Sequence, residues 1–156
     1  MTTRTMLLLL PVGAALIVLA VIVYWFFIAV PVAASPVRLM VDEHVFSVEI
    51  ADTPQKQIRG LSGRPSLAEG QGMLFLFGEE AIHGMWMPNM KFDIDILWIL
   101  DGKVVEIATL PAPTLKNPVP ARYTPQETAK WVLELPAGTA QKQGISVGSE
   151  VKLGTR

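Results

Sequence analysis

The chain has 156 residues, a formal net charge of −1 and no cysteine, and its length leaves room for one domain. Without cysteine there can be no disulfide, thiol nucleophile or zinc–thiolate site, and a nearly balanced charge without a basic stripe argues against nucleic acid as a partner. The mean hydropathy of +0.40 is too high for an ordinary soluble domain and indicates one strongly apolar segment.

The apolar excess lies at the N-terminus, in the run from Met6 to Val30. As a helix, this run is long enough to cross a hydrocarbon layer of about 30 Å. Near its far end come the aromatic residues that are typical of a lipid–water interface, Tyr24, Trp25, Phe26 and Phe27. The run therefore predicts a transmembrane helix that anchors the protein in a lipid bilayer.

This anchor divides the chain into a cytoplasmic tail (1–5), a transmembrane helix (6–30), a linker (31–36) and an exported domain (37–156). A short tail before a single domain favours a single-pass protein whose C-terminal domain is periplasmic or extracellular. The alternative is a cleaved signal peptide, because Val32 and Ala34 fit a small-residue cleavage site before Ser35. A signal-peptide core is usually about 7–15 residues long, which favours the retained anchor.

The exported part begins with two predicted strands and a helix. A strand over 37–41 is followed by a turn at Asp42-Glu43 and by a largely alternating strand that begins at Val45-Phe46. Thr53 then fits a helix N-cap, Pro54 fits the first helical position, and Gly60 is a natural stop. These signals predict one short helix between strands.

The remaining strands form the clearest pattern in the chain. The apolar run over 73–77, flanked by glycines, predicts a strand buried on both faces. Asp101-Gly102 separates two apolar runs and favours a hairpin with a type I′ turn, because both central residues of that turn need positive φ. With further strands over 131–135 and 149–153, the chain has at least seven short strands. The pattern predicts a mainly β domain, an antiparallel sandwich or barrel with one or two short helices.

One connection stands apart from this pattern, the segment from Pro111 to Lys130, which carries five prolines and no strand or helix signal. A structureless connection of this length is usually functional or disordered. Arg122 and Tyr123 are side chains that often contact a partner. The segment is therefore either a contact for a partner, expected to be another membrane protein, or a plain surface loop.

Three runs carry a family resemblance: GLSGRPSLAEGQGMLFLF, then MWMPNMKFDIDILWI, then AKWVLELPAGTAQKQGISVGSEV. In this order, from about Ile50 to Val151, the chain resembles the prokaryotic family called domain of unknown function 192. The resemblance implies a compact, mostly β domain of jelly-roll type, often carried on a signal or an anchor, with no established activity, cofactor or catalytic residue. Pro88 and Asp93 depart from the family pattern, where a basic residue and a proline are usual. Some relatives carry cysteines in the loop over 111–125, and a redox role of that loop does not transfer to this chain.

Two carboxylates share strands with apolar residues and are the first candidate site. On a strand that begins near Phe92, Asp95 faces the same way as Leu97, and Glu134 lies in a similar setting in the strand over 131–135. If these strands are close, Asp95 and Glu134 line one pocket, with Trp86 as a stacking face and Asn89 as an amide. Such a set suits sugar binding or glycoside hydrolysis. The alternative is structural, with the two carboxylates capping loop amides or pairing with arginines.

A second candidate site is copper, through His83, Met85, Met87 and Met90. Imidazole and thioether groups are soft ligands that suit Cu(I). The alternative is that the methionines fill irregular gaps in the core. The spacing alone does not establish this site, so the sequence predicts no cofactor.

The sequence lacks a recognisable nucleophile and base, so it favours a binding or accessory domain over an enzyme. We therefore expect a membrane-anchored extracytoplasmic interaction module or small subunit of a membrane complex, with a carbohydrate-binding or hydrolytic site and a Cu(I)-binding protein as alternatives.

Overall fold

A computed structural model of the chain describes residues 36–154. The predicted tail, transmembrane helix and nearly all of the linker lie outside these residues. Within residues 36–154, no helix is long and apolar enough to cross a membrane.

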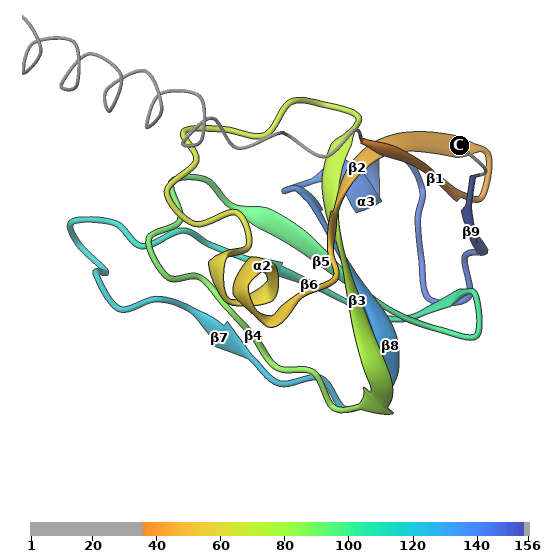
Figure 1. Ribbon diagram of the computed structural model, residues 1–156. Helices are drawn as coiled ribbons and strands as arrows, with labels where there is room; N and C mark the ends of the chain where they lie inside the picture. The colour runs from red at the N-terminus through yellow and green to blue at the C-terminus, as the bar shows by residue number, and fades with distance from the viewer. Residues whose placement is uncertain (1–35, 155–156) are drawn as a thin grey trace, which may run out of the picture. The chain divides into compact units, whose positions relative to one another are not determined.

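The described elements are short strands with two short helices among them (Figure 1). In chain order they are β1 (Val37–Val41), β2 (His44–Ala51), α2 (Pro54–Arg59), β3 (Gln71–Ala81), β4 (Met85–Trp86), β5 (Ile94–Leu100), β6 (Lys103–Leu110), β7 (Arg122–Tyr123), β8 (Ala129–Pro136), α3 (Thr139–Lys142) and β9 (Val151–Leu153). Seven of the strands form one sheet in the order β6-β5-β8-β3-β2-β1-β9, and β4 pairs with β7 in a separate ribbon. The prediction of a mainly β domain with one or two short helices is confirmed.

The predicted turns and the predicted helix are formed. Asp42 adopts a φ of 50° in the β1–β2 turn, and Asp101 and Gly102 adopt 49° and 72° between β5 and β6. At α2, the Thr53 hydroxyl oxygen accepts a hydrogen bond from the Lys56 N–H over 3.4 Å. Pro54 opens the helix and Gly60, with a φ of 47°, ends it.

The expectation of antiparallel pairing is wrong for one pair of strands. β2 and β3 run parallel, with Ser47 opposite Gln71 and Ala51 opposite Phe75. The chain leaves the end of β2, passes through α2 and a loop, and re-enters the sheet at the end where β2 began. Such a crossover is what a parallel pair needs, because a tight turn can join only antiparallel neighbours.

The sheet curls into a half-barrel and does not divide into the two sheets of a sandwich. Its two edge strands approach each other at one end, where the Val104 N–H donates to Ser149 O over 3.0 Å and the Gly148 N–H donates to Val104 O over 2.8 Å. The Val151 N–H adds a 2.7 Å bond to Gly102 O. The start of β6 and the start of β9 therefore satisfy part of each other's backbone.

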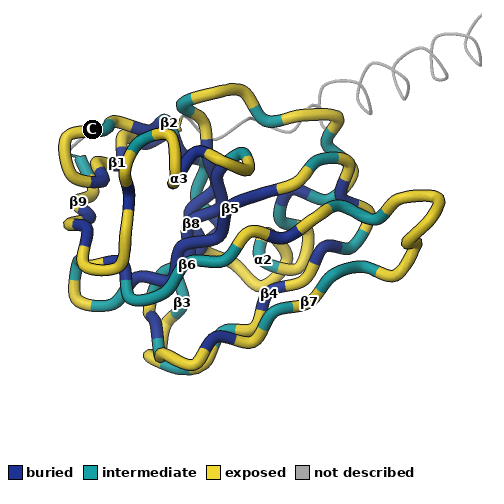
Figure 2. Tube along the Cα trace, turned by 180° about the vertical axis from the view of Figure 1, so that it is seen from behind, coloured by how far each residue is buried: buried dark blue, intermediate teal, exposed yellow. Residues whose placement is uncertain are grey.

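Both faces of the central strands are buried, as Figure 2 shows for β5 and β8. On one face, Leu97 and Leu133 belong to a cluster with residues of β1, β2 and α3. On the other face, Ile96 and Val132 belong to a second cluster, which contains the methionines of the β4 region. Alternate residues of one strand thus serve two different cores, and the site described next lies on the second face.

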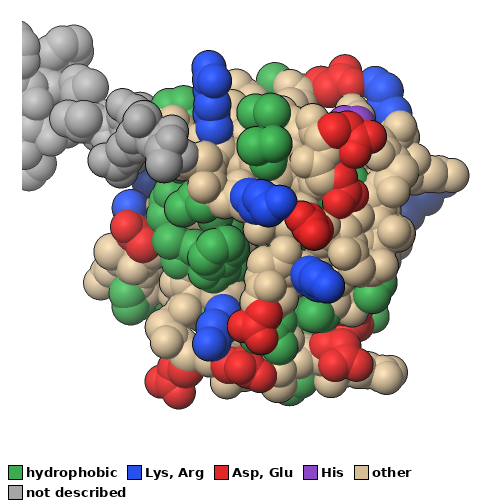
Figure 3. Space-filling model, turned by 90° about the vertical axis from the view of Figure 1, so that its right-hand side faces the viewer, with side chains coloured by type: hydrophobic (Ala, Val, Ile, Leu, Met, Phe, Trp, Pro, Cys, Tyr) green, Lys and Arg blue, Asp and Glu red, His purple; other side chains and the backbone are tan. Residues whose placement is uncertain are grey.

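The surface is mixed in charge. Figure 3 shows acidic and basic side chains interspersed on one side of the molecule, around a cluster of hydrophobic side chains. Lys56 pairs with Asp52 at 2.6 Å and Lys152 pairs with Glu150 at 2.7 Å. On the side seen in Figure 3, no single sign of charge dominates the described residues.

Candidate binding pocket

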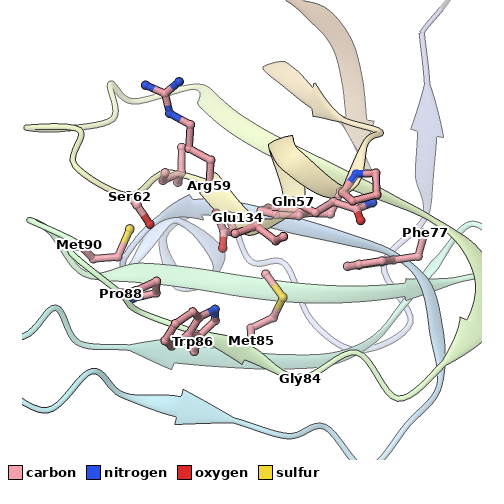
Figure 4. Close-up of a pocket in the computed structure, with 15 residues that line it drawn as sticks. Gln57, Arg59, Ser62, Phe77, Gly84, Met85, Trp86, Pro88, Met90 and Glu134 are labelled. Atoms are coloured by element: carbon pink, nitrogen blue, oxygen red, sulfur yellow. The ribbon is translucent and has the colours of Figure 1, made fainter.

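A cavity of about 270 Å³ lies between α2, the β4 segment and the face of the main sheet (Figure 4). Its walls are mostly apolar. Its lining includes Gln57, Arg59, Leu61 and Ser62 from α2 and the following turn, Phe75, Phe77 and Glu134 from the sheet, and Met85, Trp86 and Met90 from the β4 segment. An apolar hollow with a few polar groups is the usual form of a small-molecule site.

Helix α2 forms one wall because its side chain Gln57 holds it on the sheet. The Gln57 Nε2 donates to Leu76 O over 2.9 Å and to Ala51 O over 3.3 Å. These carbonyls belong to β3 and to the end of β2, the two strands that run parallel. The crossover that makes this pair parallel therefore also places α2 beside the cavity.

Glu134 lies at the inner end of the cavity. Its side chain comes from β8, the residue is only 5% exposed, and its Oε2 has no hydrogen-bond partner among the described residues. Burial raises the pKa of Glu134 to about 8, against a smaller opposing effect of the Arg64 charge. The group is therefore mainly the neutral acid at pH 7, which can both donate and accept a hydrogen bond.

The charge of Arg64 is directed at a different carboxylate. The guanidinium forms a two-bond pair with Glu49, in which Nη2 donates to Oε2 over 2.8 Å. The hydrogen bond from Arg64 lowers the pKa of Glu49. Glu49 and Glu134 both lie opposite Met73, on either side of β3. One carboxyl is thus paired and ionised, and the other is left unpaired and protonated.

Trp86 stands at the mouth of the cavity, 46% exposed. Arg122 lies opposite it in the β4–β7 ribbon, with its guanidinium carbon 4.7 Å from the centroid of the ring. This cation–π contact covers one face of the indole. A ligand that stacks on Trp86 has to use the other face or displace Arg122.

Asp95 does not line this cavity, which corrects the idea that Asp95 and Glu134 share a pocket. In the register of β5 and β8, Asp95 lies opposite Leu135, and Ile96 lies opposite Glu134. The two carboxyl groups therefore point to opposite faces of the sheet. Asp95 accepts hydrogen bonds from Thr109 Oγ1 over 2.7 Å and from the Ala140 N–H over 2.9 Å. The structural alternative, in which this carboxylate caps an amide, is the one that the structure shows.

Asn89 is also outside the set of residues that line the cavity. It adopts a φ of 53°, in the loop between β4 and β5, and its carbonyl accepts a 3.0 Å hydrogen bond from the Gly63 N–H. The loop after β4 and the loop after α2 are joined at this point. Of the four predicted ligand-binding residues, the structure brings Trp86 and Glu134 to one cavity and places Asp95 and Asn89 elsewhere.

The four residues considered for copper do not surround one space. Met85 and Met90 line the cavity, whereas Met87 is fully buried in the core beneath it. The His83 ring stacks on Phe77 with 3.7 Å between centroids, and its Nε2 lies 3.1 Å from Glu79 O. Within residues 36–154, no group of three or more His, Cys, Asp or Glu side chains is arranged to hold a metal ion.

Part of the proline-rich segment is ordered by pairing, contrary to the expectation of a structureless connection. Arg122 and Tyr123 form β7, and the last two residues of the segment begin β8. Tyr123 is only partly exposed, because its ring packs at 5.3 Å from Trp98 and its hydroxyl donates to Glu106 Oε1 over 2.7 Å. The exposed apolar residues of the segment are Leu115 and Val119 instead.

Several residues of the cavity carry no signal in the sequence. Gln57 reads as an ordinary polar helix residue, and Phe75 and Phe77 read as core residues of a buried strand. The alternation of β3 does put Phe75 and Phe77 on one face, but only the crossover places α2 above them. The predicted N-cap located the helix and did not indicate what it covers.

Comparisons with known proteins agree with this fold. Residues 37–153 match the family domain of unknown function 192, described as an uncharacterized ACR. No curated protein matches the chain.

The solved structures that are similar to it include two with 30% or more sequence identity. One, from Sinorhizobium meliloti 1021, is described as a candidate transcription regulator and is 34% identical, with a TM-score of 0.65 over 76% of this chain and 92% of the other. The second, from Novosphingobium aromaticivorans DSM 12444, is a protein of unknown function that is 30% identical, with a TM-score of 0.69 over 78% of this chain and 89% of the other. The match covers all nine described strands, and the chain belongs to the family domain of unknown function 192.

Proposed function

We propose that the domain is a binding module, held at the outer side of a membrane by residues 6–30, and that its ligand enters the cavity beside α2. The observation that carries the proposal is the buried carboxyl of Glu134, which ends in an apolar cavity with one oxygen unbonded. A buried polar atom without a partner is unfavourable in a folded protein, and a bound ligand can satisfy it.

Binding is favoured over catalysis by the groups around the cavity. Among the described lining residues, Ser62 is a possible nucleophile, but no histidine or cysteine lines the cavity with it. A carboxyl with a raised pKa suits a proton donor. Glycoside hydrolysis needs two carboxyl groups in one cleft, flanking the scissile bond, and Asp95 points to the opposite face of the sheet.

The membrane location is supported by the sequence. The 25 residues from Met6 to Val30 hold no charge and reach about 37 Å as a helix, which exceeds a hydrocarbon layer of about 30 Å. A reporter enzyme that is active only outside the cytoplasm, fused after Arg156, should be active in cells. Activity of a reporter that works only in the cytoplasm would contradict the proposed orientation.

The cavity is tested with a fragment library and ligand-observed NMR on the full chain in detergent micelles. We expect small apolar fragments to bind to the wild type and to lose most of their affinity in Trp86→Ala. Val45→Ala is the matched control, because Val45 is exposed on β2 and does not line the cavity. If no fragment distinguishes Trp86→Ala from Val45→Ala, the cavity is not the binding site.

A second surface is proposed for a membrane-protein partner, the exposed stretch over 111–121. Leu115 and Val119 are 104% and 71% exposed in it, so both apolar side chains are accessible to a partner. Arg122 lies at the end of the stretch, beside Trp86. Leu115→Ser with Val119→Ser should remove a protein that co-purifies in stoichiometric amount with the tagged full chain. The same protein should remain with Val45→Ser, an exposed change on β2 outside the cavity.

A further inference from the structure

We infer that the cavity accepts an apolar molecule that ends in a carbonyl or carboxylate oxygen, and that this oxygen takes a hydrogen bond from Glu134. The inference rests on the proposed function and names the class of its ligand. It is drawn from the position of Glu134, the charges around it and the size and lining of the cavity.

The position of Glu134 supplies the hydrogen bond. Its Oε2 is buried and without a partner among residues 36–154, and the residue lines the cavity from its inner end. Figure 4 shows the carboxyl between the α2 side and the Met85–Trp86 side of the cavity. The pKa of about 8 keeps the proton on this carboxyl at neutral pH. A protonated carboxyl is a strong donor to an acceptor oxygen that arrives from the mouth.

The surrounding charges favour an acceptor over a cation. The neighbours of Glu134 across the sheet, Met73 on β3 and Ile96 on β5, carry no charge. Arg59, at the end of α2, is the one other charged residue among the described residues that line the cavity. Nearby are Arg64 in the following loop, which pairs with Glu49 of β2, Arg122 of β7, which covers Trp86, and His83, which stacks on Phe77. Glu49 is already paired with Arg64. A protonated amine would therefore enter a cavity whose nearest charged side chains are arginines, and it would need Glu134 to lose its proton.

The size and lining of the cavity set the apolar part of the ligand. A buried cavity of about 150 Å³ is enough to hold benzene, so 270 Å³ accommodates one ring with a short arm. Phe75, Trp86 and the thioethers of Met85 and Met90 surround this space. Aromatic rings and thioethers pack well against a flat apolar ring.

The test uses three probes that share one apolar body and differ only at the end of the arm: 3-phenylpropanamide, 3-phenylpropanoate and 3-phenylpropylamine. Binding to the full chain in detergent micelles is measured by ligand-observed NMR, with empty micelles subtracted. We expect the amide and the carboxylate to bind and the amine to bind at least tenfold more weakly. The affinity for the amide, which does not titrate, should fall about tenfold between pH 7 and pH 9 as Glu134 loses its proton.

Variants of Glu134 separate a donor from an anion. In Glu134→Gln, the amide NH₂ still donates, so 3-phenylpropanamide should still bind and its affinity should no longer depend on pH. In Glu134→Leu, the donor is lost and the affinity should fall several-fold. Glu69→Gln is the matched control, because Glu69 is an exposed carboxylate outside the cavity. Urea denaturation of each variant checks that it is folded.

Two results overturn the inference and leave the proposed function intact. One is tight binding of the amine that Glu134→Gln abolishes, which would make the carboxylate a cation site. The other is no binding of any of the three probes while other fragments still distinguish Trp86→Ala from Val45→Ala. If neither the fragments nor the three probes bind, the proposed function is overturned as well.

Discussion

The Tyr123 hydroxyl and the Glu106 carboxylate are joined by a 2.7 Å hydrogen bond that links β7 to β6. The other oxygen of Glu106 accepts the backbone N–H groups of Gln126 and Glu127, over 2.8 Å and 3.1 Å. One carboxylate thus holds the chain on both sides of the turn that leads into β8. Although partial burial opposes the effect, these hydrogen bonds lower the pKa of Glu106.

Replacing Glu106 should loosen this turn. In Glu106→Gln one acceptor oxygen becomes an NH₂ group, which faces either the tyrosine or the two amides as a second donor. We expect the amides of Gln126 and Glu127 to exchange with solvent faster, as measured by NMR hydrogen exchange. Glu127→Gln is the control, because it alters the neighbouring charge and leaves the acceptor in place.

The hydrogen bonds that Glu106 accepts from Tyr123, Gln126 and Glu127 should weaken in acid. Because the folded-state pKa of Glu106 lies below its unfolded value, the stabilisation is complete above the unfolded value, and it is lost as pH falls through the folded value. Protection of the Gln126 amide should therefore drop at low pH in the wild type and change little in Glu106→Gln. Equal pH dependence in both proteins would show that Glu106 does not hold the turn.

Glu134 should have the opposite effect on the pH dependence of stability, lowering the free energy of unfolding as pH rises. Its pKa is about 8 in the folded domain, against 4.5 for the unperturbed group. Between these values the unfolded chain binds fewer protons, so the free energy of unfolding falls as pH rises, by about 1.4 kcal/mol per pH unit at most, and levels off above pH 8. Glu134→Gln removes this term and should be more stable than the wild type by a few kcal/mol at pH 9. Urea denaturation at pH 5, 7 and 9 measures the difference, and parallel pH profiles would contradict it.

Gly72 should tolerate no side chain. A Cβ at this position would lie 2.8 Å from Glu134 O and 2.9 Å from Leu135 Cδ2, which is closer than atoms pack. Gly72→Ala should therefore destabilise the domain by about 1–3 kcal/mol, as overpacked cores do. Gly78→Ala is the matched change in the same strand, because nothing lies within 4 Å of its Cβ position. Equal free energies of unfolding for the two variants would show that β3 and β8 are not packed as described.

Asp95 should prove structural. In Asp95→Asn, one acceptor oxygen becomes an NH₂ group, so the Ala140 N–H keeps an acceptor only if Thr109 turns its hydroxyl to accept from the new amide. We expect a loss of about 1–3 kcal/mol in the free energy of unfolding, with unchanged affinity for any fragment that binds beside Trp86. Thr109→Val, which removes only one bond, should cost less. Loss of fragment binding in a folded Asp95→Asn protein would return Asp95 to the site.

Local signals in the sequence were sufficient to predict the turns and helix α2. Asp101-Gly102 and Thr53-Pro54 act through their own backbone geometry, so a short window of sequence contains the whole reason. The burial of Asp95 and Glu134 was equally visible, since each alternates with apolar residues in its strand.

The arrangement of these pieces depends on contacts between distant residues. Whether Asp95 and Glu134 share a face depends on which residue of β8 lies opposite Asp95, and a shift of one residue in register would reverse the answer. The parallel pairing of β2 with β3 likewise depends on the path of the crossover. The cavity depends both on the register of β8 and on the path of the crossover. The sequence could therefore indicate Trp86 and Glu134 as candidate residues, but it could not indicate that Gln57 holds α2 beside them.

The pairing of β9 with β1 has a consequence for the biosynthesis of the protein. Met40 of β1 lies opposite Lys152 of β9. The outer edge of β1 can therefore be paired only after the ribosome has added residues more than a hundred positions later in the chain. Until then β1 is an open edge, and the start of β6 lacks the bonds from Gly148 and Val151. Contacts this distant in sequence form slowly. The sheet is therefore closed only after residues 148–153 have been synthesised, and the two edges that these residues protect are exposed until then.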